Sequence, residues 1–141
     1  MRYCITIIIL LALSFTTYAQ SDARISIGER GTKHAIAQPI SEKISASVMR
    51  ENGKLYVSAE GAGDNKYIVA QYEISVLPKG GGGDIIGPFL VKDDNAQKVF
   101  DQLHTWFETG AKVFYEKIML ICRECTPPEP INARGISVTL E

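Results

Sequence analysis

Histidine and cysteine are scarce in this chain, and their scarcity limits the chemistry that the sequence predicts. Only two histidines and three cysteines occur among its 141 residues. A structural zinc ion takes about four nitrogen, sulfur or oxygen ligands, so the only histidines, His34 and His104, would both have to join a cysteine pair. No serine or cysteine has the local signature of an activated nucleophile. The residues themselves therefore predict no metal centre and no catalytic site.

The chain also lacks a strong excess of charge of either sign. Its formal net charge is −1, and no block of about five like charges occurs, as an electrostatic tail would require. Nucleic-acid binding depends on clustered lysine and arginine side chains. The composition therefore argues against a nucleic-acid partner.

A long apolar run occurs at the N-terminus, and it predicts export. Met1–Tyr3 carries one positive charge, Ile5–Phe15 is apolar, and Thr17–Ala19 has small residues at its first and third positions. These are the features of a secretory signal peptide, and the run is shorter than the about 20 residues that span a bilayer. We expect residues 1–19 to be the signal peptide, cleaved after Ala19. Residues 20–141 then form a single periplasmic or secreted domain with no stable membrane span.

Short segments of alternating apolar and polar residues predict a mostly β fold. Residues 43–60 predict a β-hairpin that turns at Asn52-Gly53, a typical hairpin dipeptide. Residues 113–121 and 136–140 predict two strands that pair as a second hairpin. Many short strands separated by turn residues are typical of a β-sandwich.

Residues 67–77 have the clearest strand pattern in the chain. Period-two alternation places one face of a strand on the core and the other largely in water. We expect Ile74 to be buried and Glu73 to point to the opposite side. By the same alternation Tyr67 and Tyr72 fall on opposite faces, one in the core and one at the surface.

Only one segment, from Asp93 to Gly110, has a helical pattern. Its apolar residues recur on one helical face, at Val99, Leu103, Trp106 and Phe107. The acidic residues at its start suit the positive end of the helix dipole, and a glycine is a common helix stop. We expect this stripe to pack against the sheet, with a partner-binding face as the alternative.

The Cys122-x-x-Cys125 motif has three interpretations. A redox pair of the thioredoxin type needs its first cysteine at a helix N-terminus, and the prolines of Thr126–Pro130 prevent a helix there. A zinc site needs further ligands. The remaining interpretation is a structural disulfide, because Cys4 leaves with the signal peptide and an even number of cysteines reaches an oxidising compartment. Its small ring predicts a stabilisation of about 2 kcal/mol.

Three segments resemble the C-terminal domain of the GldM/PorM family, periplasmic components of the gliding-motility and type IX secretion machinery of Bacteroidetes. They are Val69–Val76 running into Lys79-Gly80, Gly110–Ile118 (GAKVFYEKI, similar to the family's GDKVYFENI) and Ile131–Val138 (INARGISV, similar to its LNPISFKI). The resemblance covers about residues 54–141. It implies an Ig-like antiparallel β-sandwich with one short α-helix.

The resemblance also implies a function in protein–protein contact, with envelope or secretion-system proteins as partners and with no cofactor. We therefore expect a non-enzymatic interaction or scaffolding module of the bacterial cell envelope. Two alternatives stay open: a thiol–disulfide-active domain that uses Cys122 and Cys125, and a module that binds a small ligand or a glycan. A deep pocket with convergent polar groups would favour these alternatives, and an open edge strand would favour the interaction module.

Overall fold

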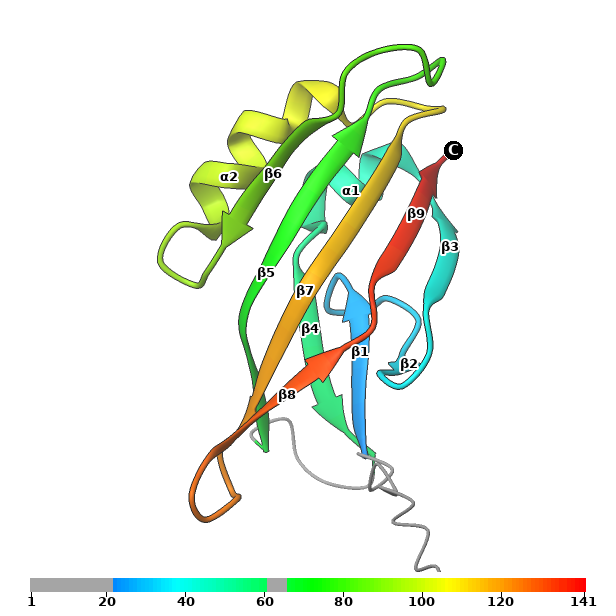
Figure 1. Ribbon diagram of the computed structural model, residues 1–141. Helices are drawn as coiled ribbons and strands as arrows, with labels where there is room; N and C mark the ends of the chain where they lie inside the picture. The colour runs from blue at the N-terminus through cyan, green and yellow to red at the C-terminus, as the bar shows by residue number, and fades with distance from the viewer. Residues whose placement is uncertain (1–21, 61–65) are drawn as a thin grey trace, which may run out of the picture.

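The structure, a computed structural model, describes residues 22–60 and 66–141 (Figure 1). The predicted signal peptide, residues 1–19, lies outside these residues. The strands are β1 (Ala23–Ile27), β2 (His34–Ala35), β3 (Ile40–Ile44), β4 (Leu55–Ala59), β5 (Tyr67–Leu77), β6 (Ile86–Val91), β7 (Lys112–Cys122), β8 (Glu129–Ala133) and β9 (Ile136–Leu140). The helical segments are α1 (Ala46–Asn52), α2 (Ala96–Leu103) and the 3₁₀ turn η1 (His104–Trp106).

Two sheets pack against each other, which confirms the predicted mostly β sandwich. The smaller sheet has the order β2-β1-β4, and the larger has the order β3-β9-β7-β5-β6, with β8 also paired to β7. The pairs are antiparallel apart from β3 and β9, which run parallel. Figure 1 shows β1 and β4 behind the larger sheet, and α2 beside β6 at one flank. None of the described helices is both long and apolar enough to cross a membrane.

The core lies between the two sheets and is filled by the inward side chains of both. Ile25 of β1, Ile74 of β5 and Tyr115 of β7 are fully buried. The burial of Ile74 confirms the core face predicted for residues 67–77. Glu73 points to the other side, where its Oε1 accepts a hydrogen bond from Lys117 Nζ at 2.9 Å.

The prediction that Tyr67 and Tyr72 lie on opposite faces is wrong, because β5 is not a regular strand. Its pairing with β7 shifts between Val69 and Gln71, so that Ala70 is an extra residue in the ladder. One extra residue reverses the alternation beyond it. Both tyrosines therefore point inward, with exposed fractions of 6% and 4%.

The hairpin predicted for residues 43–60 is wrong in its first half, which forms α1, while its second half forms β4 as expected. The Ser45 hydroxyl caps the helix by accepting a hydrogen bond from Val48 N–H at 3.2 Å. The buried residues Ala46 and Met49 are three positions apart, which is a helical spacing. A segment this short fits both the helical and the strand period. The structure therefore contains α1 in addition to the one helix that was expected.

Gly53 ends α1 through close packing, and the Asn52-Gly53 pair does not form a hairpin turn. A Cβ atom on Gly53 would lie 2.6 Å from Met49 Sδ and 2.8 Å from both the Met49 carbonyl oxygen and Phe100 Cε1. No side chain fits there without movement of its neighbours. The glycine is required because α1 and α2 approach each other at this point.

The helix predicted between Asp93 and Gly110 is confirmed in type, but it is shorter than its pattern. Val99, Leu103 and Phe107 are buried as expected. Trp106 is 39% exposed, so its assignment to the buried stripe is wrong. The chain tightens from α2 into the 3₁₀ turn η1 before this residue, and the tighter winding changes the direction of the side chain.

The strands predicted at 113–121 and 136–140 are β7 and β9, which pair antiparallel as expected. The short strand β8 was not predicted, and it pairs with the far half of β7. The strands β8 and β9 therefore lie end to end along β7 (Figure 1).

Candidate functional site

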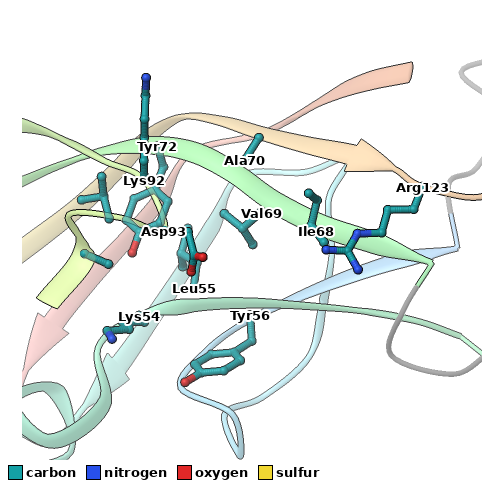
Figure 2. Close-up of a pocket in the computed structure, with 12 residues that line it drawn as sticks. Lys54, Leu55, Tyr56, Ile68, Val69, Ala70, Tyr72, Lys92, Asp93 and Arg123 are labelled. Atoms are coloured by element: carbon teal, nitrogen blue, oxygen red, sulfur yellow. The ribbon is translucent and has the colours of Figure 1, made fainter. Parts of the chain in front are cut away.

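A groove of about 310 Å³ lies at one flank of the sandwich, between β4 and β5 (Figure 2). Its lining comes from both sheets, from the turn after β6, from the start of α2 and from the loop after β7. The lining residues are Lys54, Leu55, Tyr56, Ile68, Val69, Ala70, Tyr72, Val91, Lys92, Asp93, Ala96 and Arg123.

One wall of the groove is β4, whose outer edge has no strand partner among the described residues. Gly28 N–H donates to the Lys54 carbonyl at 2.8 Å across the β1–β4 pair. Hydrogen-bonded and non-hydrogen-bonded positions alternate along an antiparallel pair. The backbone N–H and C=O groups of Leu55, Val57 and Ala59 therefore point away from β1, toward the open side.

The other wall is the N-terminal half of β5, which also has an open edge. In the described ladder β6 pairs with β5 only from Tyr72 onward. On the opposite side Arg123 N–H donates to the Lys66 carbonyl at 2.8 Å. By the same alternation Tyr67 and Val69 direct their backbone N–H and C=O groups away from β7. Figure 1 shows that β6 and α2 flank only the upper part of β5.

A turn held by Asn95 explains why β6 stops where it does. Asn95 Oδ1 accepts from Lys92 N–H at 2.7 Å, and its Nδ2 donates to the Leu90 carbonyl at 2.9 Å. Asn95 N–H also donates to the Lys92 carbonyl at 3.2 Å. Such side-chain bonds to the local backbone favour a turn over a continued strand. The chain is directed into α2 and leaves the lower half of β5 uncovered.

The charged residues of the groove are placed unevenly. Figure 2 shows Arg123 at one end, with its guanidinium group directed toward Ile68, and Lys54, Lys92 and Asp93 at the other end. No salt bridge joins Arg123 to any of residues 22–60 and 66–141. The Arg123 end is therefore positive, and the far end carries both signs.

A polar network holds the start of β5 against the start of β1. Lys66 Nζ donates to Asp22 Oδ2 at 2.8 Å, and the Tyr67 hydroxyl donates to Asp22 Oδ1. These two donors, Lys66 foremost, hold the pKa of the Asp22 carboxyl below its usual value. The network lies at the same end of β5 as Arg123 and positions the open edge.

Two neighbouring tyrosines, of which Tyr72 lines the floor of the groove, have rings tilted by 46° to each other and differ in their hydrogen bonds. The rings of Tyr72 and Tyr115 are 5.7 Å apart between centroids. The Tyr115 hydroxyl donates to the Gly53 carbonyl at 2.6 Å. The Tyr72 hydroxyl is buried with no hydrogen-bond partner in the part of the chain that the structure describes. Burial raises the pKa of Tyr72 well above its usual value, and the Leu55 backbone opposes that shift only in part.

The two predicted site residues, Cys122 and Cys125, are joined by a disulfide, with their Cα atoms 5.4 Å apart. Cys122 is fully buried at the end of β7. The chain continues into β8 without a helix, as the prolines predict, so the first cysteine lacks the helix N-terminus that a redox pair uses. Arg123 lies inside the disulfide ring, which ties this loop to the groove.

The histidines do not join the cysteines. His34 Nε2 lies 3.1 Å from Glu42 Oε2, and His104 begins η1. Within residues 22–60 and 66–141 no group of three or more histidine, cysteine, aspartate or glutamate side chains could hold a metal ion.

Sequence reasoning missed the groove, although one signal of it exists. The strand β5 has 11 residues and its neighbour β6 has 6, so part of β5 must extend beyond its partner.

Comparisons with protein-family models, with curated proteins and with solved structures find no match to this chain.

Proposed function

We infer that the chain is an exported, non-enzymatic protein-binding module of the bacterial cell envelope. The observation that carries this proposal is the groove between two open strand edges. Unpaired edge groups are a ready template for another chain, and strand addition is a common mode of peptide recognition. Both edges belong to the same groove, so one bound segment would contact both sheets.

The chemistry of the lining favours binding over catalysis. The lining residues include no histidine, serine or cysteine among those described. The charged groups are one aspartate and three cations, and most of the remaining lining is aliphatic or aromatic. This composition suits a surface that fixes a ligand by its backbone and by a few charges.

The family resemblance supports the choice of partner class. The three segments that resemble the GldM/PorM C-terminal domain lie on β5, on β7, and on β8 and β9. The strands β5, β8 and β9 all pair with β7 in the larger sheet. We propose envelope or secretion-system proteins as partners, and a role beside the gliding-motility or type IX secretion machinery. The N-terminal pattern supports a periplasmic or secreted location.

In-cell photo-crosslinking tests this proposal. A photoreactive amino acid replaces Tyr56, which is 36% exposed and lines the groove. In a control it replaces Ile85, which is 55% exposed, immediately precedes β6 and is not part of the groove lining. We expect a defined envelope protein to crosslink from the first position and not from the second. N-terminal sequencing of the exported form should begin at Gln20. An intact Met1, or the absence of crosslinks from both positions, would reject the proposed function.

A further inference from the structure

We propose that the groove binds an extended segment of a partner protein as an added antiparallel strand on β5, and that Arg123 binds a carboxylate at the C-terminal end of this segment. The inference rests on the proposed function and adds to it the chemistry and the direction of the ligand. Three observations carry it: the length of the open edge, its direction and the position of the guanidinium group.

The open edge sets the length of the ligand. It runs from Tyr67 to Gln71, because the ladder with β6 begins at Tyr72. A strand rises about 3.4 Å per residue, so an extended segment of about five residues fits beside it. The outward N–H and C=O groups of Tyr67 and Val69 supply the backbone hydrogen bonds of the new ladder.

The neighbouring strand β6 indicates the chain direction of the bound segment. An added strand antiparallel to β5 would follow β6 in line and run in the same direction as β6. It would start beside Tyr72, where β6 ends, and finish beside Tyr67. Tyr67 is paired with Cys122 on its other side, and Arg123 is the next residue. The Arg123 backbone lies on the β7 side of β5, but its guanidinium group extends toward Ile68 of β5 (Figure 2). The C-terminal end of the segment would therefore lie within reach of the Arg123 side chain.

The chemistry of the groove at Arg123 favours a carboxylate on the ligand. Arginine pairs with carboxylates through two parallel N–H···O bonds, and Arg123 has no ion-pair partner within the described residues. Its place inside the disulfide ring and its backbone bond to Lys66 hold it at the groove. The carboxylate is either an acidic side chain or the free C-terminus of the partner, since both present the same group.

The interior of the groove selects the side chains between the two ends of the bound segment. Side chains of an added strand alternate between the two faces of the sheet. Those that point inward would meet Leu55 and Val69, which are apolar. The ligand is therefore an extended segment of alternating apolar and polar residues that ends in a carboxylate.

Four five-residue peptides with fluorescent N-termini test the proposal by anisotropy with the chain from Gln20 to Glu141. The first is Thr-Val-Thr-Val-Glu amide, and the second is Thr-Val-Thr-Val-Thr with a free C-terminus. The third, Thr-Val-Thr-Val-Lys amide, reverses the terminal charge, and the fourth, Glu-Val-Thr-Val-Thr amide, moves the acid to the other end. We expect the first or second peptide to bind with a dissociation constant below about 1 mM, and the last two at least roughly tenfold more weakly. Which of the first two binds better separates a side-chain carboxylate from a C-terminal one.

Variants of the chain locate the contact. Arg123→Glu should weaken the carboxylate peptides roughly tenfold, by removing an ion pair and adding a repulsion. The matched control Arg134→Glu changes an exposed arginine outside the groove and should leave binding unchanged. Val69→Pro removes an outward N–H while keeping the ladder to β7, and it should weaken every peptide that binds. Hydrogen exchange at Tyr67 and Val69 should slow when peptide is bound.

Several results would overturn the inference. They are equal affinity for the third peptide and for the tighter binder of the first two, no effect of Arg123→Glu on that binder, protection of another strand edge, or no binding of any peptide up to about 1 mM. Self-association of the chain through the groove, seen by sedimentation, would assign the edge to a second copy and would also overturn it. The proposed function survives each of these if Tyr56 still crosslinks to an envelope protein in the cell. It fails independently if no such crosslink forms.

Discussion

The two tyrosines beneath the groove offer a test of how this core is stabilised, because deleting their hydroxyl groups should have opposite effects. Tyr115 donates a 2.6 Å hydrogen bond to the Gly53 carbonyl in a fully buried position. Tyr115→Phe removes this bond and leaves the buried carbonyl without its donor. A buried polar group left unsatisfied costs about 1–3 kcal/mol, which is a large part of the about 5–15 kcal/mol that stabilises a domain.

Tyr72→Phe removes a buried hydroxyl that has no partner among the described residues. Burying an unbonded hydroxyl costs about 1–3 kcal/mol in proteins, so the phenylalanine variant should be as stable as the parent or more so. The two rings are in contact and have the same chemistry, which makes each variant the control for the other.

Urea unfolding of both variants measures the difference. With a denaturant slope of about 1–3 kcal/mol per molar, Tyr115→Phe should lower the midpoint by roughly 1 M, and Tyr72→Phe should leave it unchanged or raise it. Equal destabilisation by the two changes would refute the reasoning. It would mean that the Leu55 backbone, which already acts to lower the pKa of Tyr72, bonds to that hydroxyl.

Three further tests concern other parts of the structure, and in the first of them Gly83→Ala is the control for Gly53→Ala. Gly53→Ala should lower the free energy of unfolding by about 1–3 kcal/mol, because its Cβ would overlap its neighbours. Gly83→Ala, where a Cβ meets nothing within 4 Å, should stay within about 0.5 kcal/mol. Replacing Cys122 and Cys125 with serine should lower the free energy of unfolding by about 2 kcal/mol, and an insulin-reduction activity lost in this variant would contradict a purely structural role. Asp22→Asn should destabilise the chain most near neutral pH, and its deficit should vanish in acid. The lowered pKa of this carboxyl gives stability that is present above its usual value of 3.8 and lost as the pH falls through the folded value. A deficit that is the same at pH 7 and in acid would show that the Asp22 carboxylate adds no pH-dependent stability.

The periodicity of the sequence was enough to predict the elements whose partners do not alter their pattern. The core face of β5 around Ile74, the pairing of β7 with β9 and the buried face of α2 at Val99 and Leu103 all follow from alternation or from helical spacing. Ile74, Val99 and Leu103 are buried as the local period predicts, so local pattern and tertiary environment agree at these positions. The cysteine pair was also readable, because its spacing and the following prolines are local features.

Tertiary structure decided the features that depend on a partner far away in the chain. The inward position of Tyr67 depends on a bulge at Ala70, which exists only because β7 pairs out of step with β5 at this point. Residues 46–52 form a helix because Met49 fills space in the core, although their short pattern allowed a strand as well.

The groove likewise depends on contacts between residues that are distant in the sequence. The open edge of β5 exists because Asn95 turns the chain away after Val91. Arg123 stands at the end of that edge because its amide bonds to Lys66, which lies 57 positions earlier in the printed sequence. The sequence by itself determined which residues are apolar, which turn the chain and which carry charge. The pairing register, which joins residues distant in the chain, decided which backbone groups stay open and which charge lies beside them, since no local pattern contains that information.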